Sequence, residues 1–117
     1  MTAFAERRIL VLEDEFLIAM DLVDLLEDLG AEIVGPAHRN EQALELLANS
    51  HVDVAVLDVN INGQRSDVVA QELRRHSIPF IFATGYGDET LLDGATVIRK
   101  PYRQPELERA LKGAMKG

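Results

Sequence analysis

The order of apolar and polar residues along the chain alternates between two patterns. Short apolar runs have the length typical of buried strands, and stretches with helical spacing of apolar residues follow most of them. The predicted strands span residues 9–12, 32–35, 52–58, 79–83 and 96–99. The predicted helices span about residues 15–29, 40–48, 66–76 and 105–115. In the first helix the apolar stripe is formed by Ile18, Leu22, Leu25 and Leu29.

Polar and special residues mark the predicted ends of the helices. Asp14 and Asn40 stand where N-caps are expected, and Ser66 or Asp67 begins the third helix. Gly30 is a stop signal for the first helix, and Pro105 fits the first turn of the last one. Residues 60–65 are predicted to be a loop.

Strands that alternate with helices predict an α/β fold with a doubly wound, five-stranded parallel sheet, because parallel strands need crossover connections. The connections should be right-handed. The segment between the last two strands, GYGDETLLDGA, holds three glycines in eleven residues. Glycine disfavours helix, so the fourth helix should be short or irregular. We expect residues 1–117 to form one domain that stands alone.

Composition narrows the classes of function. The formal net charge is −8, so phosphate-rich partners such as nucleic acids or anionic membranes are disfavoured. The chain holds no cysteine, which excludes disulfides and thiolate chemistry. No apolar run is long enough for a membrane span, and the first residues lack a signal-peptide core. We therefore expect a cytoplasmic protein whose ligand is a cation or a basic protein surface.

Chemically active residues gather at the predicted strand ends. In an open parallel sheet, ligands bind at the carboxyl ends of the strands. The first strand ends at Glu13-Asp14, the third at Asp58, the fourth at Thr84 and the fifth at Lys100-Pro101. Crowded carboxylates attract a hard divalent cation with oxygen ligands, such as Mg²⁺ (or Mn²⁺). The backbone carbonyl of Asn60 would complete such a site.

Each of these residues also has an ordinary explanation. Asp14 is an expected helix cap, Asp58 stands where turns favour Asp, and Thr84 precedes a glycine. Their combination with Lys100 on one sheet edge favours phosphoryl transfer to an Asp nucleophile.

The order of these motifs resembles the receiver domain of two-component response regulators, a flavodoxin-like fold, over essentially the whole chain. LEDE holds the acidic pair, LDVN the acceptor, ATG the hydroxyl and RKPY the lysine. The resemblance implies that Asp58 accepts a phosphoryl group from a phosphohistidine of a sensor histidine kinase. It implies metal binding by Glu13, Asp14, Asp58 and the Asn60 carbonyl, phosphoryl contacts by Thr84 and Lys100, and a cis Lys100-Pro101 bond.

Two features depart from the usual receiver. Val97 occupies the position of the aromatic switch residue, so Tyr86 and Tyr102 become the candidate switch aromatics. PFIFATGYG resembles the signature of FATGUY receivers, which suggests kinases of the HWE or HisKA2 type as donors. The resemblance also makes the acidic face of the first helix a candidate kinase-docking surface.

The resemblance implies a signalling phospho-acceptor rather than an enzyme. It would catalyse only its own phosphorylation and dephosphorylation, and would act through an unknown effector protein or as a phosphate sink. The alternative is a receiver-like interaction module that binds its partner without phosphorylation. A third hypothesis is a small phosphotransferase or phosphatase that uses Asp58, but haloacid-dehalogenase-type enzymes have a second Asp where this chain has Asn60.

Overall fold

A five-stranded parallel sheet forms the centre of the protein. The computed structural model describes residues 4–85 and 96–116, and within them the strand order is β2-β1-β3-β6-β7. The strands are β1 (Arg8–Leu12), β2 (Glu32–Ala37), β3 (Val54–Asp58), β6 (Phe80–Thr84) and β7 (Thr96–Arg99). The doubly wound α/β sheet predicted from the sequence is confirmed. The segment expected to hold a short fourth helix lies almost entirely in residues 86–95, outside the described residues.

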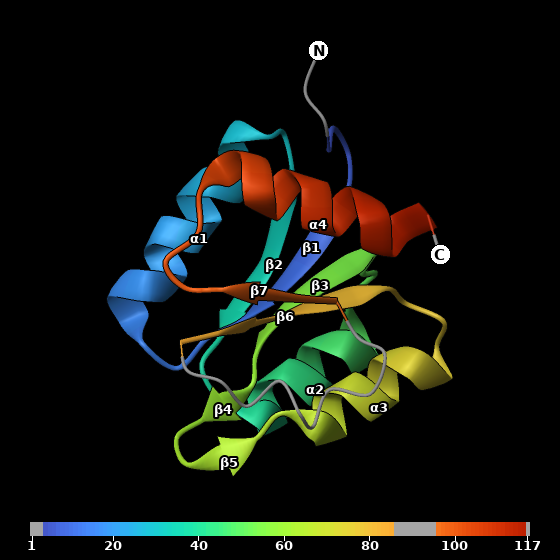
Figure 1. Cartoon of the computed structure of the whole chain (residues 1–117). Coiled ribbons are helices and arrows are strands. Elements are labelled where there is room, and N and C mark those ends of the chain that lie inside the picture. Colours follow the sequence, from blue (N-terminus) through green and yellow to red (C-terminus); the bar gives the residue numbers. More distant parts are fainter. Residues whose placement is uncertain (1–3, 86–95, 117) are drawn as a thin grey trace.

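Helices cover both faces of the sheet (Figure 1). They are α1 (Phe16–Asp28), α2 (Asn40–Asn49), α3 (Asp67–Arg75) and α4 (Gln104–Lys116). Helices α1 and α4 lie on one face, and α2 and α3 lie on the other. None of the described helices is both long and apolar enough to cross a membrane.

The core has two halves because successive side chains of a strand point to opposite faces. In β1, Leu10 and Leu12 pack toward α2 and α3, whereas Ile9 and Val11 pack toward α1 and α4. All four side chains are almost fully buried. This explains why the strands read as continuous apolar runs rather than as an alternating pattern.

The apolar stripe of α1 was predicted correctly only in part. Leu22 and Leu29 are buried, but Ile18 and Leu25 are only partly buried. The centre of the buried face lies nearer Val23 and Leu26. Ile18 and Leu25 lie at the edge of that face and line a groove beside the carboxyl edge of the sheet.

The predicted N-caps Asp14 and Asn40 are wrong. The cap of α1 is Glu15, Asn40 is the first residue of α2, and neither helix has a side-chain cap. Both polar side chains instead bond to other segments of the chain. Asp14 Oδ2 accepts the Asn62 N–H at 2.8 Å, and Asn40 Nδ2 donates to the Arg65 carbonyl at 3.0 Å.

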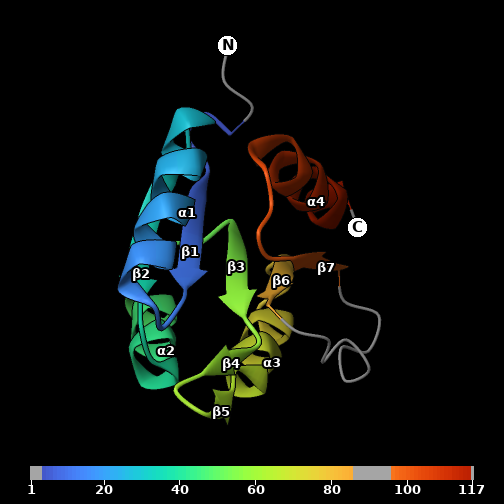
Figure 2. The same cartoon turned by 60° about the vertical axis from the view of Figure 1, so that its left-hand side comes forward.

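The predicted loop of residues 60–65 contains a small hairpin at the carboxyl end of β3 (Figure 2). Its strands are β4 (Asn60–Ile61) and β5 (Gln64–Arg65), which pair antiparallel. Asn62 and Gly63 have φ of 53° and 82°, as a two-residue type I′ turn requires. The Asn-Gly pair was the signal for this hairpin. Ile61 is 2% exposed and anchors it in the core.

Ser66 fixes the backbone of Asp58 to the start of α3. Its side chain is fully buried, and its hydroxyl donates to the Asp58 carbonyl at 2.6 Å. The bond holds the last residue of β3 in place across the intervening hairpin.

Substitution of Ser66 by Ala should lower the free energy of unfolding by about 1–3 kcal/mol, because the Asp58 carbonyl loses its hydroxyl donor. Urea unfolding followed by circular dichroism measures the change. Ser50→Ala, at the partly exposed end of α2, should change it by less than about 0.5 kcal/mol. Equal effects of the two variants would contradict the assigned bond.

Substitution of Gly35 by Ala should also destabilise the fold. Gly35 has φ of 102°, and an added Cβ would lie 2.7 Å from the Ala37 nitrogen. The free energy of unfolding should fall by more than about 1 kcal/mol. Gly113→Ala in α4 is the control, because a Cβ at this position would meet nothing within 4 Å. Since alanine favours helix over glycine, this variant should have a free energy of unfolding about 0.5–1 kcal/mol higher than the wild type. Losses of similar size in both variants would show that Gly35 has no special role.

Candidate functional site

The residues singled out at the strand ends lie along one edge of the sheet. Glu13 and Asp14 follow β1, Asp58 ends β3, Thr84 ends β6, and Lys100 follows β7. Strands β1, β3, β6 and β7 are neighbours in that order. The parallel arrangement therefore brings together side chains that are up to 87 positions apart in the chain.

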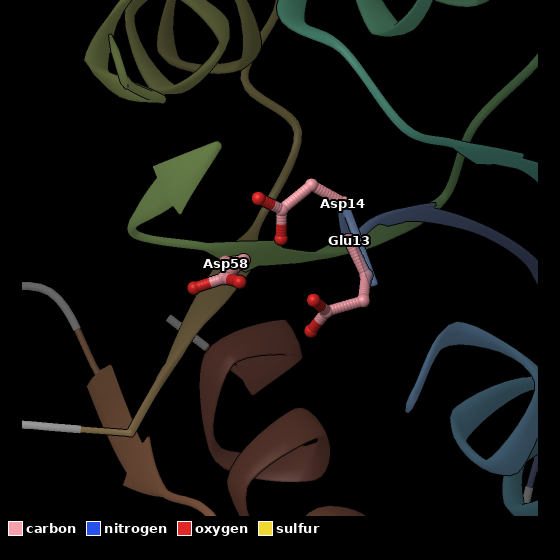
Figure 3. A group of neighbouring side chains, drawn as sticks. All are labelled: Glu13, Asp14 and Asp58. Carbon is pink, nitrogen blue, oxygen red and sulfur yellow. The ribbon is translucent and has the colours of Figure 1, made fainter. Parts of the chain in front are cut away.

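The three carboxylates form a compact cluster (Figure 3). One oxygen from each of Glu13, Asp14 and Asp58 lies within 4.8 Å of the others. The Glu13 side chain is 3% exposed and that of Asp58 is 12% exposed. Crowded acids with so little access to water need a positive partner.

Lys100 supplies part of that positive charge. Its Nζ lies 2.5 Å from Glu13 Oε1 and 3.1 Å from Asp58 Oδ2. When all groups are ionised, three carboxylates against one ammonium leave an excess of two negative charges. Carboxylate oxygens are hard ligands, so the charge and the donor set both fit a divalent cation such as Mg²⁺ or Mn²⁺.

The pKa values of the cluster reflect the same competition between burial and pairing. Burial raises the pKa of Glu13 to about 7, although hydrogen bonds from Lys100 and from the Glu15 N–H oppose the rise. For Lys100, burial lowers the pKa, but the two carboxylates outweigh it and the net shift is upward. Burial therefore disfavours the charged form of Glu13, and its hydrogen bonds offset only part of that cost.

The backbone of Asn60 faces the Asp58 carboxylate. Ile61 and Gln64 flank the turn and form the hydrogen-bonded pair of the hairpin, so the next pair, Asn60 and Arg65, directs its backbone groups outward. The Asn60 N–H accordingly points toward Asp58 Oδ1, at 3.4 Å.

Thr84 and Lys100 are held side by side. The Lys100 N–H donates to the Thr84 carbonyl at 2.8 Å, and Thr84 is 4% exposed. Both residues line the groove that contains Asp14 and Asp58. The Lys100-Pro101 peptide bond is cis.

The groove continues from the carboxylates along α1. Asp21 and Leu25 line it on the α1 side, and Pro101 and Tyr102 line it on the other. Burial raises the pKa of Tyr102, and the carboxylates of the site and of Asp21 raise it further. Of the two candidate switch aromatics, Tyr102 is thus beside the site, whereas Tyr86 lies outside the described residues.

Sequence reasoning missed an apolar surface next to the acidic pair. Phe16, Leu17 and Met20 are 63%, 75% and 36% exposed at the start of α1. Phe16 and Leu17 follow the acidic residues directly, and both fall outside the predicted apolar stripe. Two large apolar residues outside the stripe were the signal from which this surface could have been predicted. The sequence had pointed only to the acidic face of this helix.

Val97 packs in the core half that contains Phe82, where it is partly buried. The position three before Lys100 therefore holds a packed aliphatic side chain. Its two methyl groups offer nothing equivalent to an aromatic ring that turns between two positions.

The sequence is similar to several known proteins. Residues 9–112 match the response regulator receiver domain family. The phyllosphere-induced regulator PhyR of Methylorubrum extorquens is 32% identical over 92% of this chain and 43% of its own length. The transcriptional regulatory protein PdtaR of Mycobacterium tuberculosis is 34% identical over 80% of this chain and 46% of its own length. The chain thus spans less than half of either relative.

Solved structures share the fold. The receiver domain of PhyR from Erythrobacter litoralis superposes with a TM-score of 0.85 and 28% identity, covering 97% of this chain and 93% of the other. SdrG from Sphingomonas melonis Fr1 gives a TM-score of 0.82 and 38% identity, and the match covers 100% of both chains. Together with the family match over most of the sequence, these similarities show that the chain belongs to the response regulator receiver domain family.

Proposed function

We propose that the protein is a Mg²⁺-dependent phospho-acceptor of a two-component system, with Asp58 as the residue that is phosphorylated. The observation that supports this most directly is the position of Asp58. Its carboxylate ends a central strand, lies within 4.8 Å of two other carboxylates and contacts the Lys100 ammonium at 3.1 Å. An unphosphorylated acid with these neighbours is suited to phosphoryl transfer.

In the proposed reaction a carboxylate oxygen of Asp58 attacks the phosphorus of a phosphohistidine. The new O–P bond forms as the P–N bond breaks, and the departing imidazole keeps the electron pair of that bond and takes up a proton. Glu13, Asp14, Asp58 and the Asn60 carbonyl would hold the metal. When bound, Mg²⁺ would neutralise charge on the carboxylates and on the phosphoryl oxygens.

The remaining residues would stabilise the phosphorylated state. Lys100 already contacts Asp58 Oδ2, so its ammonium is placed to meet a phosphoryl oxygen on the same carboxylate. Thr84 lines the same groove and offers a hydroxyl donor. Both groups would contact the phosphoryl group once it is bound to Asp58.

The donor we propose is a sensor histidine kinase, of the HWE or HisKA2 type. The apolar surface of Phe16, Leu17 and Met20 lies directly beside the site and would contact the helices that carry the phosphohistidine. The acidic residues Asp21 and Asp24 on the exposed side of α1 would contact basic groups of the same kinase.

Output would pass through another protein, or the chain would act as a phosphate sink. The similarity to SdrG along the whole of both chains supports a role as a stand-alone receiver. The second candidate function is an interaction module that does not require phosphorylation. The packed Val97, in the position expected of a switch aromatic, favours it.

Phosphorylation is tested by intact-mass measurement after incubation with Mg²⁺ and acetyl phosphate. The wild-type protein should gain one phosphoryl group, and Asp58→Asn and a sample with EDTA should gain none, because each lacks part of the reacting site. A kinase of the HWE type serves as a second donor. A protein that binds Mg²⁺ but gains no phosphoryl group from either donor would support the interaction module instead.

Kinase docking is tested with Leu17→Ala, which removes the most exposed apolar side chain of α1. Transfer from the phosphorylated kinase should slow about fivefold to tenfold, the loss typical of one important interface residue. Phosphorylation by acetyl phosphate should be unchanged, because a small donor needs no docking surface.

Val68→Ala is the matched control for docking, since Val68 is 46% exposed but lies on α3, on the other face of the sheet. Its transfer rate from the kinase should equal that of the wild type. A fall in both variants, or in neither, would exclude α1 as the docking surface.

A further inference from the structure

The hairpin after β3 is bonded directly to one of the proposed metal ligands. The backbone N–H of Asn62 donates to Asp14 Oδ2 at 2.8 Å, across 48 positions of sequence. This bond fixes the orientation of the carboxylate through Oδ2, and the second oxygen, Oδ1, takes no part in it. Asp14 is otherwise only partly buried at the start of a loop, where its side chain would have rotational freedom.

Asn62 is itself held in place through its side chain. Its Nδ2 donates to the His38 carbonyl at 3.2 Å. Its backbone has φ of 53°, a conformation that glycine and asparagine adopt readily. Glycine would satisfy the turn but would lack the side-chain donor. Asparagine therefore serves both the turn and the link to the loop after β2.

The loop after β2 also contacts the acidic segment. The ring Nδ1 of His38 lies 2.8 Å from the Glu13 carbonyl and donates its proton to it, since a carbonyl can only accept. Asn40, just beyond, donates to the Arg65 carbonyl at the far end of the hairpin. The hairpin is thus tied to His38 in the loop after β2 and to Asn40 at the start of α2, and His38 also holds the Glu13 backbone.

We propose that Asn62 is a positioning residue for the metal site. Its amide orients Asp14, and its side chain keeps that amide in place by binding the His38 carbonyl. The same hairpin carries the Asn60 carbonyl, so one element sets the positions of two proposed ligands. The role rests on the proposed binding of Mg²⁺ by this cluster. Groups that orient metal ligands commonly change metal affinity when they are removed.

The test is Asn62→Gly, which keeps the backbone N–H and accepts the positive φ but removes the Nδ2 donor. Titration calorimetry should give a dissociation constant for Mg²⁺ roughly tenfold higher than that of the wild type. The urea midpoint of the metal-free protein should change little, because the lost bond is exposed.

Asn49→Ala is the matched control. It also removes an asparagine Nδ2 bond to a backbone carbonyl, that of Glu45 at 2.9 Å, but at the far end of α2. Its affinity for Mg²⁺ should equal that of the wild type. Amide hydrogen exchange of the metal-free proteins gives a second readout, and exchange at position 62 should be faster in Asn62→Gly than in the wild type.

Two results would overturn the role of Asn62. One is an Asn62→Gly variant that binds Mg²⁺ as tightly as the wild type; the other is a loss of affinity that Asn49→Ala shares. A wild-type protein that fails to bind Mg²⁺ would instead overturn the proposed metal site, and the role of Asn62 with it. The wild-type titration therefore separates failure of the proposed function from failure of this inference.

Discussion

The proposed chemistry of this receiver depends on the crowding of Glu13, Asp14 and Asp58 at one edge of the sheet, with Lys100 bonded to two of them. When all groups are ionised, one ammonium leaves two negative charges uncompensated, and burial makes the charged form of Glu13 costly, which raises its pKa. Such an imbalance fits a divalent cation, and the proposed function brings an anionic phosphoryl group to the same place. The rest of the fold serves to hold these groups at short distances.

Buried strands and a few hydrogen bonds from the connecting segments hold the carboxylates and Lys100 in place. The strands place the residues in register, since β1, β3, β6 and β7 are parallel neighbours. Ser66 then fixes the Asp58 backbone, and the Asn62 amide orients Asp14. The Asn62 bond spans 48 positions of the sequence, and the Asn62 side chain also binds His38, so the site is tied to the hairpin and to the loop after β2.

Much of the architecture could be predicted from local patterns. Apolar runs such as residues 9–12 are buried strands because both faces of the sheet are covered. Helical spacing of apolar residues marked α1, and Pro105 marked the start of α4. The errors arose where a polar residue had two satisfactory partners. Asp14 and Asn40 suit helix caps, but each bonds to another loop in the folded protein. The Asn-Gly turn was visible in the sequence, yet two strands of two residues each are too short for an alternating pattern to reveal.

The sequence by itself determined the fold class, the family and the residue types at the strand ends, because periodicity and motif order are local or linear properties. Only the tertiary structure decided which atoms meet. Lys100 could have neutralised any nearby acid, and its contacts with Glu13 and Asp58 follow from the positions of β1, β3 and β7 in the sheet. The same holds for Asn62 and His38, whose roles rest on bonds between distant segments. Such bonds depend on three-dimensional distance, which no spacing along a single chain specifies.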